Sequence, residues 1–231
     1  MITIKHAVKK YGSNIVLNVE ELNIGRGEIF GLVGNNGAGK TTLFSAILDL
    51  VRLAEGRIEN NGTDVSESEE WKIYTSAYLD EKFLIGYLTP AEYFEMIGKL
   101  RHIGTDEVHK FIANYNEFFN GELDGKQKYI RNLSKGNQQK VGVIGALIGQ
   151  PQIVILDEPF SSLDPTSQYR LRNILKSFSI ENNSTILISS HDLKHVAELC
   201  TRIVILEKGK VIDDVISTEQ TMERLERYFA V

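Results

Sequence analysis

The sequence predicts an α/β fold whose core is a mainly parallel sheet, and three features of the chain support this. Residues 29–33 form an apolar run that leads through a glycine-rich loop into residues 43–51, where apolar side chains recur at helical spacing. The runs 153–156 and 185–188 are apolar throughout and end in polar residues, as parallel strands buried on both faces do. Residues from about 90 to 149 instead carry helical patterns, which indicates a helical subdomain inserted into the core.

Two short hairpins complete the β-structure that we expect in the first part of the chain. Residues 2–8 and 15–24 resemble strands joined by a turn-rich connection. After the strand-like residues 57–59, Asn60-Asn61-Gly62 is a strong turn signal. Both hairpins fit an antiparallel β flap beside the parallel core.

One domain over residues 1–231 accommodates these elements. The α/β core with its flap takes residues 1–89 and 150–231, and the helical subdomain takes residues from about 90 to 149. Polar joints that contain glycine separate the helices expected in the subdomain, which cover residues 91–102, residues 106–119 and a third segment that begins near Ser134.

The last part of the chain continues the core. Asp164-Pro165 is a helix start, because Asp is a favourable cap and Pro fits the first helical position. Residues 203–206 and 211–212 are expected strands around a tight turn. A final helix would begin near Ser217 and carry the apolar residues Met222, Leu225 and Phe229.

The glycine-rich loop after the first core strand is predicted to bind phosphate. Its glycines let the backbone curl so that successive N–H groups point at an anion, with the positive end of the next helix behind them. Lys40 would reach the β- and γ-phosphates, and the Thr41 hydroxyl would bind the Mg²⁺ that bridges them. The strand and helix on either side favour this interpretation over a turn with a stray lysine. We therefore predict a P-loop nucleoside triphosphatase core with a nucleotide site at Gly34, Asn35, Asn36, Gly37, Ala38, Gly39, Lys40, Thr41 and Thr42.

Two acids follow the apolar run 153–156 and sharpen this prediction. Asp157 would bind Mg²⁺ through water, and Glu158 would orient or deprotonate a water molecule near the γ-phosphate. Acids at the start of a surface loop are common, but a buried strand and an upstream phosphate loop favour the catalytic interpretation. Together the loop and the acids predict nucleotide hydrolysis.

Composition limits the other classes of function. No apolar stretch is long enough to span a membrane, and the N-terminus has no signal-peptide layout. Cys200 is the only cysteine, so a reducing cytoplasm is the simplest location, and its apolar neighbours predict a buried packing role. The net charge of −5 argues weakly against a nucleic-acid partner.

A stretch ahead of Asp157 resembles the signature of a known family. Residues 133–140 read Leu-Ser-Lys-Gly-Asn-Gln-Gln-Lys, similar to the Leu-Ser-Gly-Gly-Gln signature of the ATP-binding cassette (ABC) ATPases. Tyr11 resembles the aromatic residue that stacks on adenine in that family, and His191 resembles its switch histidine. Residues 161–164 resemble the loop after the catalytic acid. The resemblance covers essentially the whole chain.

This resemblance implies a mechanism that needs two cassettes arranged head to tail around two ATP molecules. Ser134 and the Gly136 N–H of one subunit would contact the γ-phosphate held by the phosphate loop of the other. His191 would hydrogen-bond the γ-phosphate, so the catalytic set would be Glu158, His191 and Lys40. The resemblance also implies nucleotide contacts for three further residues, Tyr11, Asn137 and Asp164.

Four positions depart from the family pattern. Glu81 is the best match to the glutamine in the loop between the core and the subdomain, where it would accept from Mg²⁺-bound water. Lys135 replaces a signature glycine, and Asn137 replaces the signature glutamine. Phe160 stands where many relatives have a small polar residue, and the sequence assigns it no role.

Among the ABC ATPases, the chain looks like the stand-alone ATPase subunits of bacterial exporters for drugs, antibiotic peptides or lipid-linked molecules. The resemblance implies a second cassette, most simply a copy of this chain, and separate membrane subunits that hold the chain at the cytoplasmic face. Residues 83–88 are apolar enough to receive such a subunit, although a loop packed on the core would have the same sequence. The alternative is a soluble ABC ATPase in DNA repair or on ribosomes. The absence of a long coiled coil between Lys40 and Leu133, and the single cassette, argue against it.

Overall fold

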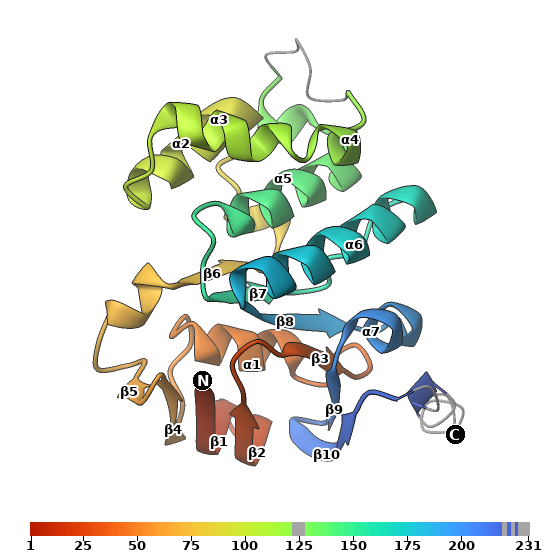
Figure 1. The fold of residues 1–231 in the computed structure, drawn as a ribbon. Helices are drawn as coiled ribbons and strands as arrows, with labels where there is room; N and C mark the ends of the chain where they lie inside the picture. The colour runs from red at the N-terminus through yellow and green to blue at the C-terminus, as the bar shows by residue number, and fades with distance from the viewer. Residues whose placement is uncertain (122–127, 219–220, 223–224, 226–231) are drawn as a thin grey trace.

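The computed structural model describes residues 1–121, 128–218, 221–222 and 225. Two sheets and the helices between and above them form stacked layers, with the smaller sheet at the base of Figure 1 and the helical subdomain at the top. The α/β fold with a parallel core and an antiparallel flap is confirmed. In the described part of the chain the larger sheet has six strands, in the spatial order β10 (Lys210–Ile216), β9 (Arg202–Glu207), β3 (Ile29–Val33), β8 (Thr185–Ser190), β7 (Ile153–Leu156) and β6 (Thr75–Tyr78).

All neighbouring strands of this sheet are parallel except β10, which runs antiparallel to β9. The carboxyl ends of β3, β7 and β8 therefore lie together at one edge of the sheet, which is where ligands bind in open α/β sheets. The flap is a four-stranded antiparallel sheet in the order β2 (Asn14–Ile24), β1 (Ile2–Tyr11), β4 (Glu55–Asn60) and β5 (Thr63–Asp64).

The strands of the larger sheet alternate between two hydrophobic cores, one on each face. In β3, Phe30 and Leu32 face the core under the flap, while Ile29 and Val33 face the core under the other helices. Helix α1 (Lys40–Ile47) lies between the larger sheet and the flap. The opposite face is covered by α5 (Lys135–Leu147), α6 (Pro165–Asn182) and α7 (Leu193–Leu199).

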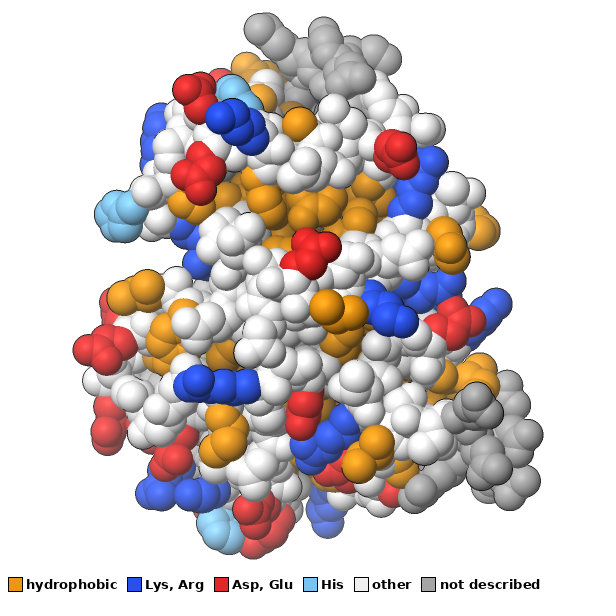
Figure 2. Space-filling view, in the orientation of Figure 1, with side chains coloured by type: hydrophobic (Ala, Val, Ile, Leu, Met, Phe, Trp, Pro, Cys, Tyr) orange, Lys and Arg blue, Asp and Glu red, His pale blue; other side chains and the backbone are white. Residues whose placement is uncertain are grey.

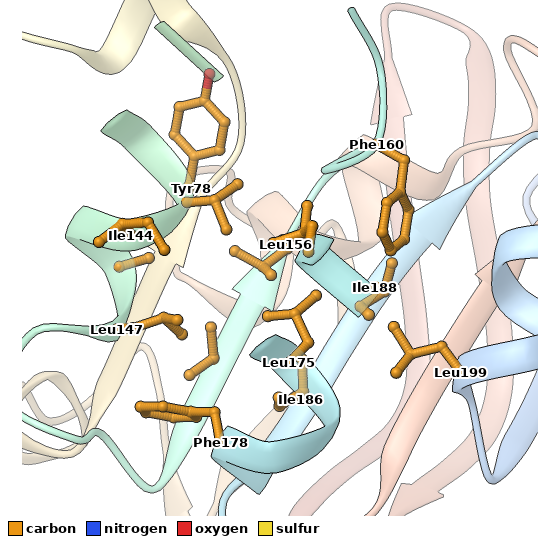
Figure 3. Close-up of a cluster of buried hydrophobic side chains, with 14 of the residues drawn as sticks. Tyr78, Ile144, Leu147, Leu156, Phe160, Leu175, Phe178, Ile186, Ile188 and Leu199 are labelled. Carbon is orange, nitrogen blue, oxygen red and sulfur yellow. The ribbon is translucent and has the colours of Figure 1, made fainter. Parts of the chain in front are cut away.

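Figure 3 shows this second core from inside, with side chains of α5 and α6 meeting those of β7 and β8. Cys200 is buried in the same core, and burial raises the pKa of its thiol. The packing role predicted for Cys200 is thus confirmed. It lies against β3 at Gly31, where any side chain would collide with Val196.

The helical subdomain lies above β6 and β7 in Figure 1. Besides α5 it contains the helices and short 3₁₀ turns η2 (Glu81–Phe83), α2 (Pro90–Leu100), α3 (Thr105–Ala113), α4 (Asn116–Phe119) and η3 (Ile130–Asn132). A further 3₁₀ turn, η1 (Glu70–Ile73), precedes β6. The expected helix 106–119 is broken around Asn114 and Tyr115 into α3 and α4, so that prediction of one continuous helix is wrong.

One strand was not predicted from the sequence, and one predicted helix lies mostly outside the described residues. Strand β6 was not predicted, because Thr75–Tyr78 is short and only partly apolar. The predicted final helix lies mostly outside the described residues, although Leu225 is buried in the core. None of the described helices combines the length and apolar character needed to cross a bilayer. On the face in Figure 2, positive and negative side chains are interspersed rather than gathered into single-sign fields.

Candidate nucleotide site

The phosphate loop leaves β3 at Val33 and returns as α1 at Lys40. Gly39 caps the helix with a φ angle of 106° and no side-chain hydrogen bond, so the first N–H groups of α1 have no side-chain cap. A side chain at Gly34 would collide with the Leu206 carbonyl, and a Cβ at Gly39 would lie 2.9 Å from the Val16 carbonyl oxygen. Glycine is therefore needed here for close backbone packing as well as for the turn.

Lys40 is buried, and its ammonium group lies inside the loop. Nζ donates to the Gly34 carbonyl at 2.7 Å and lies 3.5 Å from the Glu158 carboxylate. A buried cation beside uncapped N–H groups attracts a polyphosphate chain, because both contribute positive potential to the same space.

Asp157 follows β7 and receives two hydroxyl hydrogen bonds, from Thr41 and from Ser189. Burial raises the pKa of Asp157, and the two hydroxyl bonds oppose that rise. Within the described residues, no group of three or more His, Cys, Asp or Glu side chains could hold a metal ion. Thr41 and Asp157 instead offer two adjacent hard oxygens, which suits Mg²⁺, an ion that completes its shell with water and substrate phosphates.

Glu158 divides its carboxylate between two partners. Oε1 faces Lys40, while Oε2 lies 2.8 Å from Nδ1 of His191 and accepts from the His191 N–H at 3.3 Å. His191 follows β8, so adjacent strands of the sheet bring the glutamate and the histidine together. A carboxylate held beside a lysine and a histidine is placed to accept a proton from a water molecule.

The signature residues Ser134 and Gly136 lie at the start of α5. Ser134 is exposed and caps α5, with its Oγ accepting from the Asn137 N–H at 3.3 Å. At Gly136 a Cβ would lie 2.7 Å from the Ser162 carbonyl oxygen. Among the described residues, no hydrogen bond joins Ser134 or Gly136 to the phosphate loop.

The remaining predicted site residues are not gathered at the phosphate loop. Tyr11 is exposed near the tip of the first hairpin, with the Lys9 ammonium 4.8 Å from its ring centroid. Asp164 caps α6 by accepting from two backbone N–H groups at 3.0 Å, so its observed role is structural. Glu81 forms an ion pair with Lys135, which joins two of the positions that depart from the family pattern. Roles in nucleotide or metal binding stay predictions for Tyr11, Asp164 and Glu81.

Sequence reasoning missed three hydrogen-bonding side chains at this site. The Ser189 hydroxyl donates to the Asp157 carboxylate and accepts from the Glu158 N–H. Ser189 directly follows the predicted strand 185–188. Gln139 and Tyr78 form a buried chain of hydrogen bonds to the Glu158 carbonyl. Gln139 could have been noticed in the sequence, because it is a polar residue just before the apolar residues 141–147 of the same helix. Phe160, which had no predicted role, stacks on His195 with ring centroids 4.6 Å apart.

Comparison with known proteins decides the family. The sequence family described as "ABC transporter" matches residues 17–161, which is more than half of the chain. The chain belongs to the ABC transporter family. It is an ATP-binding subunit and an ATPase of that family, as its phosphate loop and acids predicted.

Relatives of this ABC protein cover most of its length. The uncharacterized ABC transporter ATP-binding protein YhaQ of Bacillus subtilis is 38% identical over 92% of this chain and 70% of its own. The bacitracin transport ATP-binding protein BcrA of Enterococcus faecalis is 29% identical over 95% of this chain and 70% of its own. The tungstate uptake protein TupC of Peptoclostridium acidaminophilum is 33% identical over 91% of this chain and 96% of its own. A solved dimeric bacterial ABC transporter cassette superimposes with a TM-score of 0.84 at 25% identity, over 94% of this chain and 99% of that one.

Proposed function

We propose that this chain is the motor subunit of an ABC exporter, which dimerises around Mg²⁺-ATP and drives separate membrane subunits from the cytoplasmic face. One observation carries the proposal. Lys40, Thr41, Asp157, Glu158 and His191 share a continuous polar site, whereas Ser134, at the exposed start of α5, is hydrogen-bonded to none of them in the described part of the chain.

The residues Lys40, Thr41, Asp157, Glu158 and His191 form what we call the closed half of the ATP site. Each of these side chains has a role in hydrolysis. Lys40 and the N–H groups of the loop hold the β- and γ-phosphates of ATP. Thr41 and Asp157 would hold Mg²⁺, which would offset the charge of the phosphates. Glu158 accepts a proton from the attacking water, and His191 holds the glutamate in place and donates toward the γ-phosphate.

The exposed start of α5 supports dimerisation. An exposed serine and the first N–H groups of a helix suit an anion, and within the described residues Ser134 bonds to the Asn137 N–H and not to the phosphate loop of the same chain. A second cassette in head-to-tail orientation brings this anion site to the γ-phosphate of the first. The simplest second cassette is another copy of this chain.

Exposed apolar side chains near the base of the subdomain support a membrane partner. Within the segment 83–88, Leu84 is buried, but Phe83 and Tyr87 are 63% and 68% exposed. Ile73 and Leu100 are also largely exposed, and Arg101 joins their two elements by donating to the Ile73 carbonyl at 3.1 Å. Exposed apolar side chains close together in one short segment, as Phe83 and Tyr87 are, favour a protein interface. The relative named for bacitracin transport supports an exporter, whereas the one named for tungstate uptake defines the competing direction.

An affinity purification from detergent-solubilised membranes tests the proposal. We expect tagged wild-type protein to recover a polytopic membrane protein in a near one-to-one ratio, and the double variant Phe83→Ser, Tyr87→Ser to lose it while still hydrolysing ATP. Ile180→Ser is the matched control, because Ile180 is 72% exposed on α6, outside the proposed interface. Recovery of ribosomal or DNA-bound proteins, or of no membrane protein, would count against a transport motor. Uptake rather than efflux by the recovered complex in membrane vesicles would overturn the exporter assignment alone.

A further inference from the structure

The backbone of Glu158 adopts an unusual conformation that its neighbours impose. Its φ angle is 47°, in the left-handed region that glutamate rarely adopts. The Glu158 N–H donates to the Ser189 hydroxyl at 2.9 Å, and its carbonyl oxygen accepts from the Ser161 N–H at 3.1 Å. This conformation directs the carboxylate toward Lys40 and His191, so whatever stabilises it also positions the proton acceptor.

A buried glutamine supplies a second hydrogen bond to the same carbonyl. Nε2 of Gln139 donates to the Glu158 carbonyl at 3.1 Å, and the Gln139 side chain is nearly inaccessible to solvent. Gln139 lies on α5, so this bond connects α5 with residues 158–161, which we call the catalytic turn. Loss of the Gln139 donor would leave the carbonyl with the Ser161 N–H alone and would weaken the hold on this turn.

Tyr78, the last residue of β6, fixes the orientation of the Gln139 amide. Its hydroxyl donates to Oε1 of Gln139 at 3.1 Å, which leaves the amide nitrogen facing Glu158. Burial raises the pKa of Tyr78, so the hydroxyl keeps its proton. The ring packs against α5 at Gly142, where a side chain would collide with it, and this explains a glycine in the middle of a helix.

We infer that Tyr78 and Gln139 are positioning residues for ATP hydrolysis, which act through the backbone of Glu158. The two side chains form a relay from β6 through α5 to the catalytic turn. This inference rests on the proposed function in one respect. If the start of α5 contacts the ATP of a second cassette, the relay also links that ATP to the glutamate of the first.

A substitution that can regain the lost donor separates positioning from simple loss of structure. In Gln139→Glu, the ionised carboxylate cannot donate to the Glu158 carbonyl, so we expect kcat to fall about 10- to 100-fold at pH 8, with KM for ATP within about twofold of wild type. A protonated carboxyl has nearly the shape of the amide and can donate. The ratio of variant to wild-type kcat is therefore expected to rise toward pH 6. Gln139→Leu is expected to lose the same activity at both pH values.

Two further variants complete the design. Gln168→Glu is the matched control, because the Gln168 amide also donates to a backbone carbonyl of this loop, that of Phe160, but not to Glu158. We expect its kcat to stay within about twofold of wild type at both pH values. Tyr78→Phe removes one hydroxyl and is expected to lower kcat about two- to tenfold. Added to Gln139→Leu, the same change should have no further effect, because no amide remains to be oriented.

Circular dichroism and thermal unfolding of each variant establish that it is folded before its kinetics are compared. The relay is overturned if folded Gln139→Leu hydrolyses ATP at the wild-type rate, or if Gln168→Glu loses as much activity as Gln139→Glu. It is also overturned if Gln139→Glu shows no recovery toward pH 6. These outcomes are distinct from failure of the proposed function, which would appear as a wild-type protein that lacks a membrane partner.

Discussion

The phosphate-loop end of the core and the start of α5 carry the two halves of the proposed ATP site, and they differ in how their polar groups are satisfied. At the first, Lys40, Asp157 and Glu158 are largely buried and hydrogen-bonded to residues of three strands or their loops. At the second, Ser134 and Lys135 are exposed, and within the described residues their side chains bond only to Asn137 and Glu81.

This difference has a physical meaning. Buried charges are costly unless they are paired, so the phosphate end must be completed within one chain as it folds. At the exposed helix end, water satisfies the polar groups in the single chain. Little free energy is therefore lost while no second cassette is bound. The predictions below break one half or the other, beginning with the largest expected effect.

Removing the proton acceptor of the closed half is expected to have the largest effect. Glu158→Gln should slow ATP turnover about 10²- to 10⁴-fold while ATP binding persists, because the amide keeps the shape of the carboxylate but accepts no proton. Steady-state phosphate release and binding of a fluorescent ATP analogue measure the two properties. Glu107→Gln, an exposed change on α3, is the control. Unchanged turnover in Glu158→Gln would refute the role of Glu158.

Mixing lesions in the two halves tests whether they belong to different chains of one dimer. Lys40→Ala and Ser134→Glu should each lower ATPase activity by about 10²-fold or more, since the first removes a phosphate cation and the second adds a like charge. In a mixture, each heterodimer keeps one intact composite site, so an equimolar mixture should recover about a quarter of wild-type activity. Mixing two preparations of Lys40→Ala is the control. No recovery in the heterodimer would mean that the signature does not act on the partner's ATP.

The smallest expected effect concerns His195, whose protonation affects the stability of the folded protein. His195 is buried against Phe160, and burial lowers its pKa, an effect that the nearby Arg172 and Lys194 reinforce and Asp192 and Glu198 oppose. The folded protein therefore binds this proton less readily than the unfolded chain. The stabilising contribution of neutral His195 is complete above the ordinary histidine pKa and is lost as the pH falls toward the lowered value.

Urea unfolding at pH 7.5 and 5.5 measures this contribution. We expect the loss of unfolding free energy between the two pH values to be smaller in His195→Phe than in wild type, because phenylalanine keeps the aromatic contact and does not titrate. His102→Asn changes an exposed histidine at a φ of 57°, which asparagine tolerates, and should leave the difference unaltered. An identical pH difference in wild type and His195→Phe would show that His195 does not contribute.

The sequence by itself determined the elements that depend on local spacing. The strand, glycine loop and helix around Lys40 are encoded by an apolar run, by backbone freedom and by helical periodicity within about twenty residues. The turn at Asn61-Gly62 was equally local, since both residues take positive φ values in the hairpin. Asp157 and Glu158 could be assigned because they follow a strand whose burial was evident from its composition.

Only the tertiary structure decided which distant side chains meet. Ser189 reaches Asp157 because β7 and β8 are neighbours in the sheet, an order that no local pattern contains. Gln139 reaches Glu158 only because α5 packs on the face of the sheet at that end. Strand β6 is short and was recognisable only once it paired with β7. Local sequence specifies backbone conformation through steric and hydrophobic periodicity, whereas these contacts depend on how crossover connections place one element beside another.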